Sequence, residues 1–336
     1  MSNLLEVENL KVHFPIHSGG FFKRVTNYVR AVDGVSFTIQ RGETLGLVGE
    51  SGSGKTTVGR SLLRAIDLTE GQVTFHLNGR PVDLMGLQSQ DLRRFRRHMQ
   101  MIFQDPYASL NPRMTVRDII AEPLLANKLA KGRDVDQKVR ETAERCKLNL
   151  EHLRRFPHAF SGGQRQRIGI ARALVSNPEF IVCDESVSAL DVSIQADILN
   201  LLWDLQRQLG LTYLFIAHDL SVVAHISTRV AVMYVGTFVE LAPTKKLFFT
   251  PRHPYTAALL SAIPEVDLNK TMKPVTLSGE IPNPAKPPSG CRFHTRCAYV
   301  QDRCRTETPA WRQLDDDHFV ACHFAESLSL PGVELA

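Results

Sequence analysis

The chain has 336 residues, of which 43% are hydrophobic and 22% charged, with a formal net charge of +5. These values are ordinary for a globular protein that is long enough for more than one domain. The mild charge does not indicate a nucleic-acid partner, because basic runs such as residues 93–97 are usually solvated helix faces. No apolar run approaches the roughly 20 residues that span a bilayer, and residues 1–10 lack the pattern of a signal peptide. We therefore expect a cytosolic protein unless a partner tethers it.

The first segments alternate apolar and polar residues. Leu4 to Phe14 and Val29 to Ile39 show this pattern and are expected to be strands of an antiparallel-leaning subdomain. From Glu43 the pattern changes to an apolar strand, a glycine-rich turn and a helix. This order is typical of an α/β fold with a parallel sheet flanked by helices.

The glycine-rich turn is a complete G-x-x-x-x-G-K-[ST] motif at residues 49–56, between a strand-like and a helix-like segment. Its glycines let successive N–H groups point inward, and the following helix start favours a polyanion. Lys55 supplies charge for β- and γ-phosphates, and the Thr56 hydroxyl is placed to ligate Mg²⁺. A purely structural turn is the alternative, which the Lys-Thr pair and the flanking segments disfavour. The expected ATP contacts here are Gly49, Ser51, Gly52, Ser53, Gly54, Lys55, Thr56 and Thr57.

An acidic pair ends the apolar run Phe180 to Cys183. Asp184 and Glu185 thus follow a strand at its carboxyl end, where ligands of open α/β sheets collect. We expect Asp184 to hold Mg²⁺ through water and Glu185 to polarise the attacking water. Alone, such a pair is as often a solvated turn, but the phosphate loop favours the catalytic interpretation.

Four further motifs follow in a single order, and with them the chain resembles the ATP-hydrolysing subunit of an ABC transporter. They are Gln104 in residues 101–106, the run 160–164, the run 188–191 and His218. They resemble that family's Q-loop, signature, D-loop and switch histidine. The resemblance implies that Gln104 senses Mg²⁺ and γ-phosphate, that Asp191 belongs to the catalytic machinery, and that His218 contacts the γ-phosphate. A lone histidine at a strand end is otherwise more often structural.

The signature also has a direct physical interpretation. Ser161 precedes a strong helix pattern over residues 164–175, so it and the glycine N–H groups form a second anion-binding helix start. The resemblance implies a head-to-tail dimer in which ATP lies between one subunit's phosphate loop and the other's signature. The base is expected to stack on Phe14, with Tyr28 as the alternative, although a Phe in an amphipathic strand is usually core. The signature residues expected at ATP are Ser161, Gly162, Gly163 and Gln164.

One position departs from the family pattern. After the Asp-Glu pair the family usually has Pro, whereas this chain has Ser186. Pro fixes φ and lacks an N–H, so Ser allows a looser backbone and adds a donor. Because Glu185 is intact, we expect hydrolysis to survive at a reduced rate.

The expected domains follow from these patterns and the resemblance. Residues 1–104 and 179–250 form the ATPase core, with its parallel sheet and antiparallel β subdomain. Residues 105–178 contain helix-like stretches at 117–129 and 135–146 and form an inserted helical subdomain. Residues 251–336 look like the carboxyl-terminal extension of oligopeptide and dipeptide importers. By resemblance, the helical subdomain receives short helices of the permease, and Gln104 is its hinge.

Four of the six cysteines lie in this extension, spaced C-x5-C-x6-C-x17-C. Disulfides are disfavoured in a reducing cytosol, and zinc sites usually show tighter pairs. Zinc, an iron–sulfur cluster and unligated thiols remain alternatives on spacing alone. The resemblance to the peptide-importer branch implies a [4Fe–4S] cluster held by Cys291, Cys297, Cys304 and Cys322.

The expected function is therefore an ATPase that powers import of oligopeptides or dipeptides, with ATP, Mg²⁺ and the cluster as cofactors. The implied partners are a second ABC ATPase subunit in a heterodimer, two transmembrane permease subunits and an extracytoplasmic peptide-binding protein. Two identical ATPase copies remain open. The expected location is the cytoplasmic face of the inner (plasma) membrane, as a peripheral subunit. Nickel, haem or glutathione are alternative cargoes, and an ABC ATPase outside transport is a further alternative.

Overall fold

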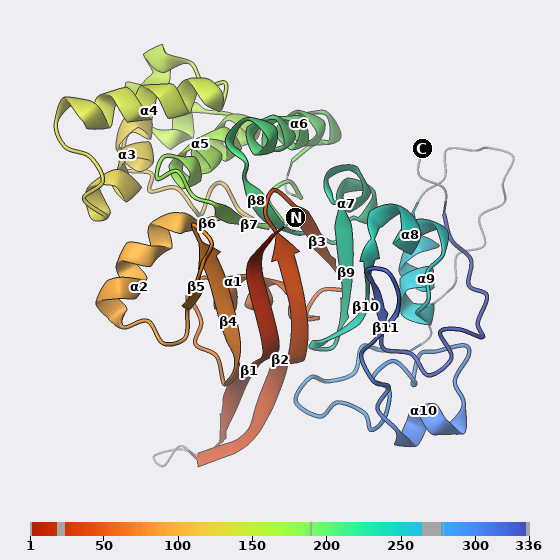
Figure 1. Ribbon diagram of the computed structural model, residues 1–336. Helices are drawn as coiled ribbons and strands as arrows, with labels where there is room; N and C mark the ends of the chain where they lie inside the picture. The colour runs from red at the N-terminus through yellow and green to blue at the C-terminus, as the bar shows by residue number, and fades with distance from the viewer. Residues whose placement is uncertain (1, 19–23, 189, 264–276, 278, 334–336) are drawn as a thin grey trace, which may run out of the picture. The chain divides into compact units, whose positions relative to one another are not determined.

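The computed structural model describes residues 2–18, 24–188, 190–263, 277 and 279–333. The chain divides into two compact units, and its elements are labelled in Figure 1. Unit 1 comprises Met1–Leu5, Ile39–Thr44 and Thr74–Ile216, and unit 2 comprises Glu6–Thr38, Leu45–Val73 and Ala217–Ala336. Each unit is described by itself.

Unit 1 contains a parallel sheet of β6 (Met99–Ile102), β7 (Phe180–Asp184) and β8 (Thr212–Ile216). Every residue of β7 and β8 is buried. Strands buried on both faces read as continuous apolar runs, which is why the sequence pattern indicated a parallel sheet here. The register pairs Asp184 with Ile216, so both strands end together. The chain also forms a hairpin in which the end of β4 (Glu70–Leu77) pairs with β5 (Arg80–Asp83).

The helices of unit 1 begin at polar capping residues. Thr115, Ser161 and Asp191 each accept a backbone N–H of the following helix through the side chain. The helix expected at 117–129 ends at Ala126, where Asn127 follows as the C-cap. Apolar faces of α3 pack on α4 and α5. The helices are α2 (Ser89–Phe95), α3 (Val116–Ala126), α4 (Arg133–Arg145), α5 (Gly162–Leu174) and α6 (Val192–Leu209), with short 3₁₀ turns at Arg96–His98, Leu150–Arg154 and Pro157–Ala159.

Unit 2 holds most of β1 (Asn3–Ser18) and β2 (Arg24–Gln40), the two long strands that the alternating pattern indicated. Unit 2 also holds most of β3 (Thr44–Val48), which pairs in parallel with β9 (Arg229–Tyr234). The expected strand pair after His218 is confirmed, because β9 and β10 (Thr237–Pro243) are antiparallel neighbours. The helices between these strands are α1 (Lys55–Leu62) and α7 (Leu220–Ile226).

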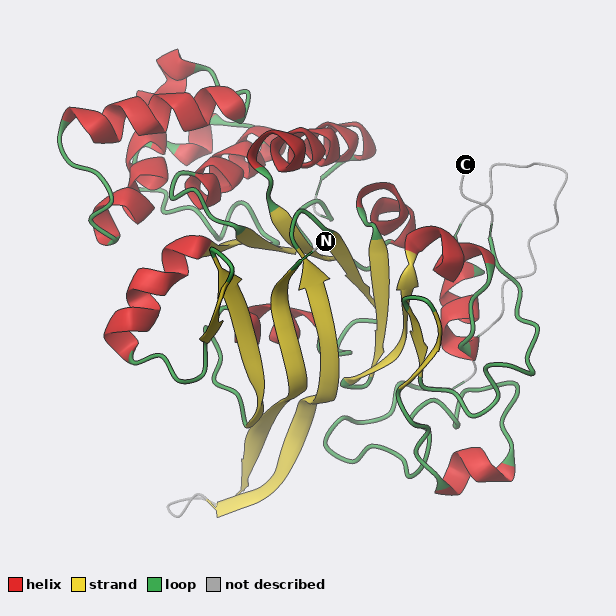
Figure 2. Cartoon of the chain, viewed as in Figure 1, coloured by secondary structure: helices red, strands yellow, loops and turns green. Residues whose placement is uncertain are grey.

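The last part of unit 2 is mainly loops with short elements (Figure 2). Its strand β12 (His318–Val320) pairs with β10 and β11 (Arg312–Asp315), which extends the sheet of β9. A small apolar cluster of Val320, Cys322 and Ala325 packs with Phe324 nearby. The helices of this part are α8 (Thr244–Phe249), α9 (Pro254–Leu260) and α10 (Asp302–Thr306). In the described parts of the chain, the structure has no helix with the length and apolar character needed to cross a membrane.

The cap of α3 gives a test of the local folding argument. The Thr115 hydroxyl oxygen accepts the Asp118 N–H at 3.2 Å and donates to the Asp118 carboxylate at 2.7 Å. Thr115→Ala removes both bonds, and we expect it to cost about 1 kcal/mol and to lower the thermal midpoint by about 2 °C. Scanning calorimetry measures this shift. Thr115→Ser keeps the oxygen and serves as the control, so an equal loss in both variants would contradict the capping role.

Candidate active site

The phosphate-loop motif runs from β3 to α1, as expected. Gly49 has φ 149° and Gly54 has φ 109°, a region that other residues avoid. A Cβ at Gly49 would lie 2.1 Å from the Met233 carbonyl oxygen, and one at Gly54 would lie 2.1 Å from that of Ala31. The loop therefore passes so close to neighbouring backbone that glycine is required at both positions.

Lys55 points back into this loop. Its ammonium donates to the carbonyl oxygens of Gly49 at 2.7 Å and Glu50 at 2.9 Å, and the residue is only 5% exposed. Burying an ammonium is costly unless polar partners surround it, and the loop's carbonyls provide them. A positive charge is thus fixed at the start of α1, where helix N–H groups add to the field.

Glu50, the second residue of the loop, is fixed from the carboxyl-terminal part of unit 2. Its carboxylate accepts two hydrogen bonds from Arg296, at 2.6 and 3.0 Å. Its N–H donates to the Tyr255 hydroxyl at 2.9 Å. The sequence analysis did not single out Arg296 or the Tyr255 hydroxyl. No local signal pointed to them, because each lies more than 200 positions from Glu50 along the chain.

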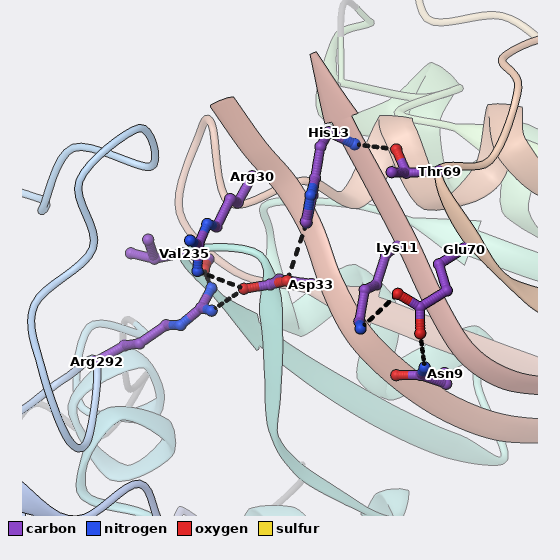
Figure 3. A network of polar contacts seen from close by, with 9 residues as sticks. All are labelled: Asn9, Lys11, His13, Arg30, Asp33, Thr69, Glu70, Val235 and Arg292. Atoms are coloured by element: carbon purple, nitrogen blue, oxygen red, sulfur yellow. Dashed lines mark hydrogen bonds and ion pairs between the residues drawn. The ribbon is translucent and has the colours of Figure 1, made fainter. Parts of the chain in front are cut away.

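Phe14, the expected base-stacking residue, lies on β1 with 39% of its surface exposed. Its neighbour His13 contacts the Asp33 carboxylate at 2.9 Å through Nε2, and Arg292 contacts the same carboxylate (Figure 3). Burial raises the pKa of Asp33, but the hydrogen bonds and charges of Arg292 and His13 outweigh it, so the pKa is lowered overall. The stacking role of Phe14 stays a prediction, as does the alternative, Tyr28, which is 49% exposed.

The acidic pair lies at the end of β7. Asp184 is the last residue of the strand and is 2% exposed, whereas Glu185 begins the following turn with φ 45°. A non-glycine residue in this region is strained and such strain gathers at functional sites. The amide nitrogen of Gln104 donates to the Glu185 carboxylate at 2.7 Å. The structure therefore brings together two of the residues that the sequence analysis selected.

The expected signature residues form a capping box at the start of α5. The Ser161 hydroxyl accepts the Gln164 N–H at 3.4 Å, and the Gln164 side-chain oxygen accepts the Ser161 N–H at 3.1 Å. Gly163 lies against α6, since a Cβ there would be 2.4 Å from the Ile194 side chain. The expected helix start is confirmed, while contact of these groups with a nucleotide stays a prediction.

Asp191 and His218 both lie at helix starts. Asp191 caps α6 by accepting the Ile194 N–H at 3.0 Å, and this bond, with that from Ser193, lowers the pKa of its carboxyl. Ala189 of the same motif lies outside the described residues. His218 is exposed in the turn between β8 and α7.

The remaining residues of the phosphate-loop motif differ in exposure. Ser51 and Gly52 are exposed, and Ser53 is buried. Thr56 and Thr57 are half-buried in the first turn of α1.

Ser186, the departure from the family pattern, is 1% exposed, and among the described residues its hydroxyl has no hydrogen-bond partner. Its neighbour Ser188 is exposed and donates its hydroxyl to the Glu185 carbonyl oxygen at 2.9 Å. The two serines of one turn thus differ in whether their hydroxyl is satisfied.

The prediction of a [4Fe–4S] cluster, and with it a metal-binding cysteine site, is wrong. Within the described ranges, no group of three or more His, Cys, Asp or Glu residues could hold a metal ion. The four thiols are free and line one small pocket of about 20 Å³, which is room for about one water. Burial raises the pKa of Cys291 to about 12 and that of Cys322 to about 11, and it also raises the pKa of Cys297. The thiols concerned are Cys291, Cys297, Cys304 and Cys322.

The unpartnered Ser186 hydroxyl predicts an unusual stabilising substitution. Leaving a buried hydroxyl unsatisfied costs about 1–3 kcal/mol, so Ser186→Ala is expected to raise the thermal midpoint by about 2 °C. Ser188→Ala, the matched control, removes a formed hydrogen bond and is expected to lower it. ATP turnover of Ser186→Ala is expected to stay within about twofold of the parent. A lower midpoint for Ser186→Ala would show that its hydroxyl has a partner.

The buried thiols predict slow alkylation. Because the folded pKa of Cys291 is about 12 and that of Cys322 about 11, the native protein holds little thiolate there at pH 8. We expect iodoacetamide to modify these positions at least tenfold more slowly than in urea-unfolded protein, as measured by peptide mass spectrometry. The raised folded pKa also means that stability is retained below about pH 9 and falls as the pH rises toward 12. Equal native and unfolded rates would contradict the burial argument.

Comparisons with known proteins identify the family of this chain. A model of the ABC transporter family matches residues 32–188, and one of the oligopeptide/dipeptide transporter C-terminal region matches residues 239–304. The oligopeptide transport ATP-binding protein AppF of Bacillus subtilis is 51% identical over 323 residues, covering 95% of this chain and 97% of that relative. The probable peptide ABC transporter ATP-binding protein y4tS of Sinorhizobium fredii is 51% identical over 320 residues, covering 95% and 89%.

Solved structures show the same fold. The dimeric, ADP- and Pi-bound structure of the ATP-binding cassette MJ0796 is 26% identical with a TM-score of 0.61, covering 71% of this chain and 98% of that one. The cbiO1 structure from Clostridium perfringens is 24% identical with a TM-score of 0.62, covering 74% and 91%. The fold is thus the α/β fold of ABC ATPases. With half of its residues identical to AppF over almost the full length of both chains, this chain belongs to the ATP-binding proteins of ABC transporters, in the oligopeptide branch.

Proposed function

We propose that this chain is the ATPase subunit that powers import of oligopeptides or dipeptides through a membrane permease, by dimer closure on ATP and reopening after hydrolysis. The observation that carries the proposal is the similarity to oligopeptide transport ATP-binding proteins over 95% of the chain, together with the matched C-terminal region at 239–304. The buried Lys55 in its glycine loop supports ATP as the fuel, because it holds a positive charge where inward N–H groups gather.

The phosphates of ATP are bound by the phosphate loop. The Lys55 ammonium, which now donates to the Gly49 and Glu50 carbonyls, is the group for the β- and γ-phosphates. Mg²⁺ fits the expected donors, because a hydroxyl, an amide oxygen and a carboxylate are hard oxygen ligands. The Gln104 amide N–H donates to the Glu185 carboxylate, and the amide oxygen is the proposed ligand of the cation. Mg²⁺ bound there neutralises phosphate charge, and its proposed ligands are Thr56, Gln104 and Asp184.

Hydrolysis needs a positioned water. Glu185 is the proposed base: it takes a proton as the water oxygen bonds to the γ-phosphorus and the bond to the β-phosphate oxygen breaks, giving ADP and inorganic phosphate. The hydrogen bond from Gln104 orients its carboxylate. His218 is proposed to contact the γ-phosphate and to help align the water.

A second ATPase subunit completes the proposed site. In the head-to-tail arrangement, ATP at one subunit's phosphate loop meets the signature of the other subunit. The capping box at Ser161 supports this, because it orders the start of α5 while the neighbouring glycines add no side chain. Asp191 acts beside this contact, and Phe14 stacks on the base. The dimeric MJ0796 structure with ADP and Pi provides a precedent in a protein of this fold.

The proposed assembly places this subunit as a peripheral protein at the cytoplasmic face of the inner membrane. Its partners are a second, different ATPase subunit, two permease subunits and an extracytoplasmic peptide-binding protein. Residues 1–104 and 179–250 are the proposed ATPase core, 105–178 the helical subdomain that contacts the permease, and 251–336 the importer-type extension. Similarity to relatives named for peptide transport supports this assembly.

The proposal is tested at the catalytic base. Glu185→Gln keeps the shape of the side chain and removes its charge, so ATP turnover of the assembled complex is expected to fall at least 100-fold. Phosphate release measures turnover, and retention of labelled ATP measures binding. Uptake of labelled peptide into proteoliposomes is expected to stop while ATP stays bound.

Glu141→Gln is the matched control, because Glu141 is an exposed acid on the surface of α4 that accepts a hydrogen bond from Gln137. It should leave turnover and uptake unchanged. Undiminished phosphate release from Glu185→Gln would remove Glu185 as the base. ATP turnover that is insensitive to peptide-loaded binding protein would contradict the import function.

A further inference from the structure

The carboxyl-terminal part of unit 2 contacts the phosphate loop directly. The segment 291–297 carries two arginines, Arg292 and Arg296, whose side chains are 16% and 6% exposed. Arginine is rarely so buried unless it is paired. Each of them makes its ion pair with a residue near the amino-terminal end of the chain, Asp33 and Glu50 respectively.

The pair between Arg296 and Glu50 has two-point geometry. Nη1 and Nη2 of Arg296 lie 2.6 and 3.0 Å from the two carboxylate oxygens of Glu50. The Glu50 side chain is 24% exposed, so the pair is shielded from much of the solvent. The hydrogen bond that Arg296 donates to Glu50 is the main cause that raises the pKa of the Arg296 guanidinium. Such paired hydrogen bonds between charged groups are stronger and more directional than neutral ones.

The backbone of Glu50 is fixed as well. Its N–H donates to the Tyr255 hydroxyl at 2.9 Å. Tyr255 is fully buried beside Tyr234 and Phe293, with ring centroids 4.6 and 5.3 Å away. The packed rings have few alternative rotamers, so this aromatic cluster holds the Tyr255 hydroxyl in place against the loop.

The consequence for the loop follows from the same atoms. The Glu50 carbonyl oxygen is one of the two that hold the Lys55 ammonium, at 2.9 Å. The other is the Gly49 carbonyl oxygen, at 2.7 Å, which shares one planar peptide unit with the Glu50 N–H. Fixing the side chain and the N–H of Glu50 therefore restrains the residue's backbone and the direction of the Gly49 carbonyl. Arg296 thus acts on the phosphate-binding charge through one residue.

A second contact reaches the other end of the expected nucleotide site. Arg292 contacts Asp33, whose carboxylate also contacts His13 at 2.9 Å (Figure 3). His13 precedes Phe14, the proposed base-stacking residue. The segment 291–297 therefore contacts the phosphate loop directly, and it contacts β1, the strand of Phe14, through Asp33 of the neighbouring strand β2.

We propose that Arg296 is a positioning residue for ATP: it acts through Glu50 to hold the phosphate loop ready for nucleotide. The carboxyl-terminal extension would thereby set the subunit's affinity for ATP. This inference rests on ATP binding at the phosphate loop and does not depend on the cargo or on the permease.

The test measures MgADP binding to the full-length chain by calorimetry, and KM and kcat for ATP in the assembled complex. Arg296→Ala is expected to weaken MgADP binding and to raise KM about tenfold, with kcat within about twofold. Arg296→Lys restores the charge but only one point of contact, so it should recover part of the affinity. Arg303→Ala is the matched control, because Arg303 is exposed and pairs with the exposed Glu307.

A double-mutant cycle separates positioning from a general loss of structure. If Arg296 acts through Glu50, Arg296→Ala should have no further effect on MgADP affinity in a Glu50→Ala background. Additive losses in the double variant, or an unchanged affinity in Arg296→Ala, would overturn the proposal. If Arg296→Ala does not fold, as judged by circular dichroism, Glu50→Gln keeps the side-chain shape and must itself weaken MgADP binding about tenfold. If Arg296→Ala lost peptide uptake but bound MgADP with normal affinity, this inference would be wrong, whereas the proposed import function would not be contradicted.

Discussion

The proposed nucleotide site depends on one interaction, the contact of the Lys55 ammonium with carbonyl oxygens of its own glycine-rich loop. The Lys55 side chain is buried, and the oxygens of Gly49 and Glu50 replace the water that it lost. Those carbonyls can turn toward it only because glycine adopts φ 149° at position 49 and φ 109° at position 54. The close approach of the Met233 and Ala31 backbones then leaves no space for a side chain. A polyanion that arrives at this loop meets a charge that is already desolvated and therefore interacts with it strongly.

The loop needs support because a glycine-rich turn has little stiffness of its own. That support comes from the opposite end of the chain, through the Arg296 guanidinium and the Tyr255 hydroxyl on Glu50. The aromatic cluster behind Tyr255 prevents the hydroxyl from shifting. Nucleotide affinity and the packing of the carboxyl-terminal extension are thus linked properties of one unit.

How far the sequence could predict this site depends on the distance between partners along the chain. The phosphate loop, the acidic pair and the Ser161 cap are local patterns, and the structure has the elements that those patterns predicted. The contact of Arg296 with Glu50 spans 246 positions and has no periodicity or motif, so it could not be predicted. The prediction for the four cysteines of the extension was wrong for a different reason. The family resemblance implied that they hold a cluster, and they do line one pocket, but in the described parts of the chain no group of side chains could hold a metal ion.

The turn after β7 connects the chemistry to the helical part of unit 1. Glu185 adopts φ 45°, a conformation that costs about 1–3 kcal/mol and persists only when its surroundings fix it. The Gln104 amide on its carboxylate and the Ile216 carbonyl on its N–H, at 2.9 Å, are two such contacts. Gln104 is the second residue after β6 and precedes the segment that leads to α3. A change of charge at Glu185, as when it takes a proton, weakens the bond to Gln104, because a neutral carboxyl is a poorer acceptor than a carboxylate. The proposed sensing role of Gln104 rests on this bond, because Gln104 is covalently joined to the segment that leads to α3.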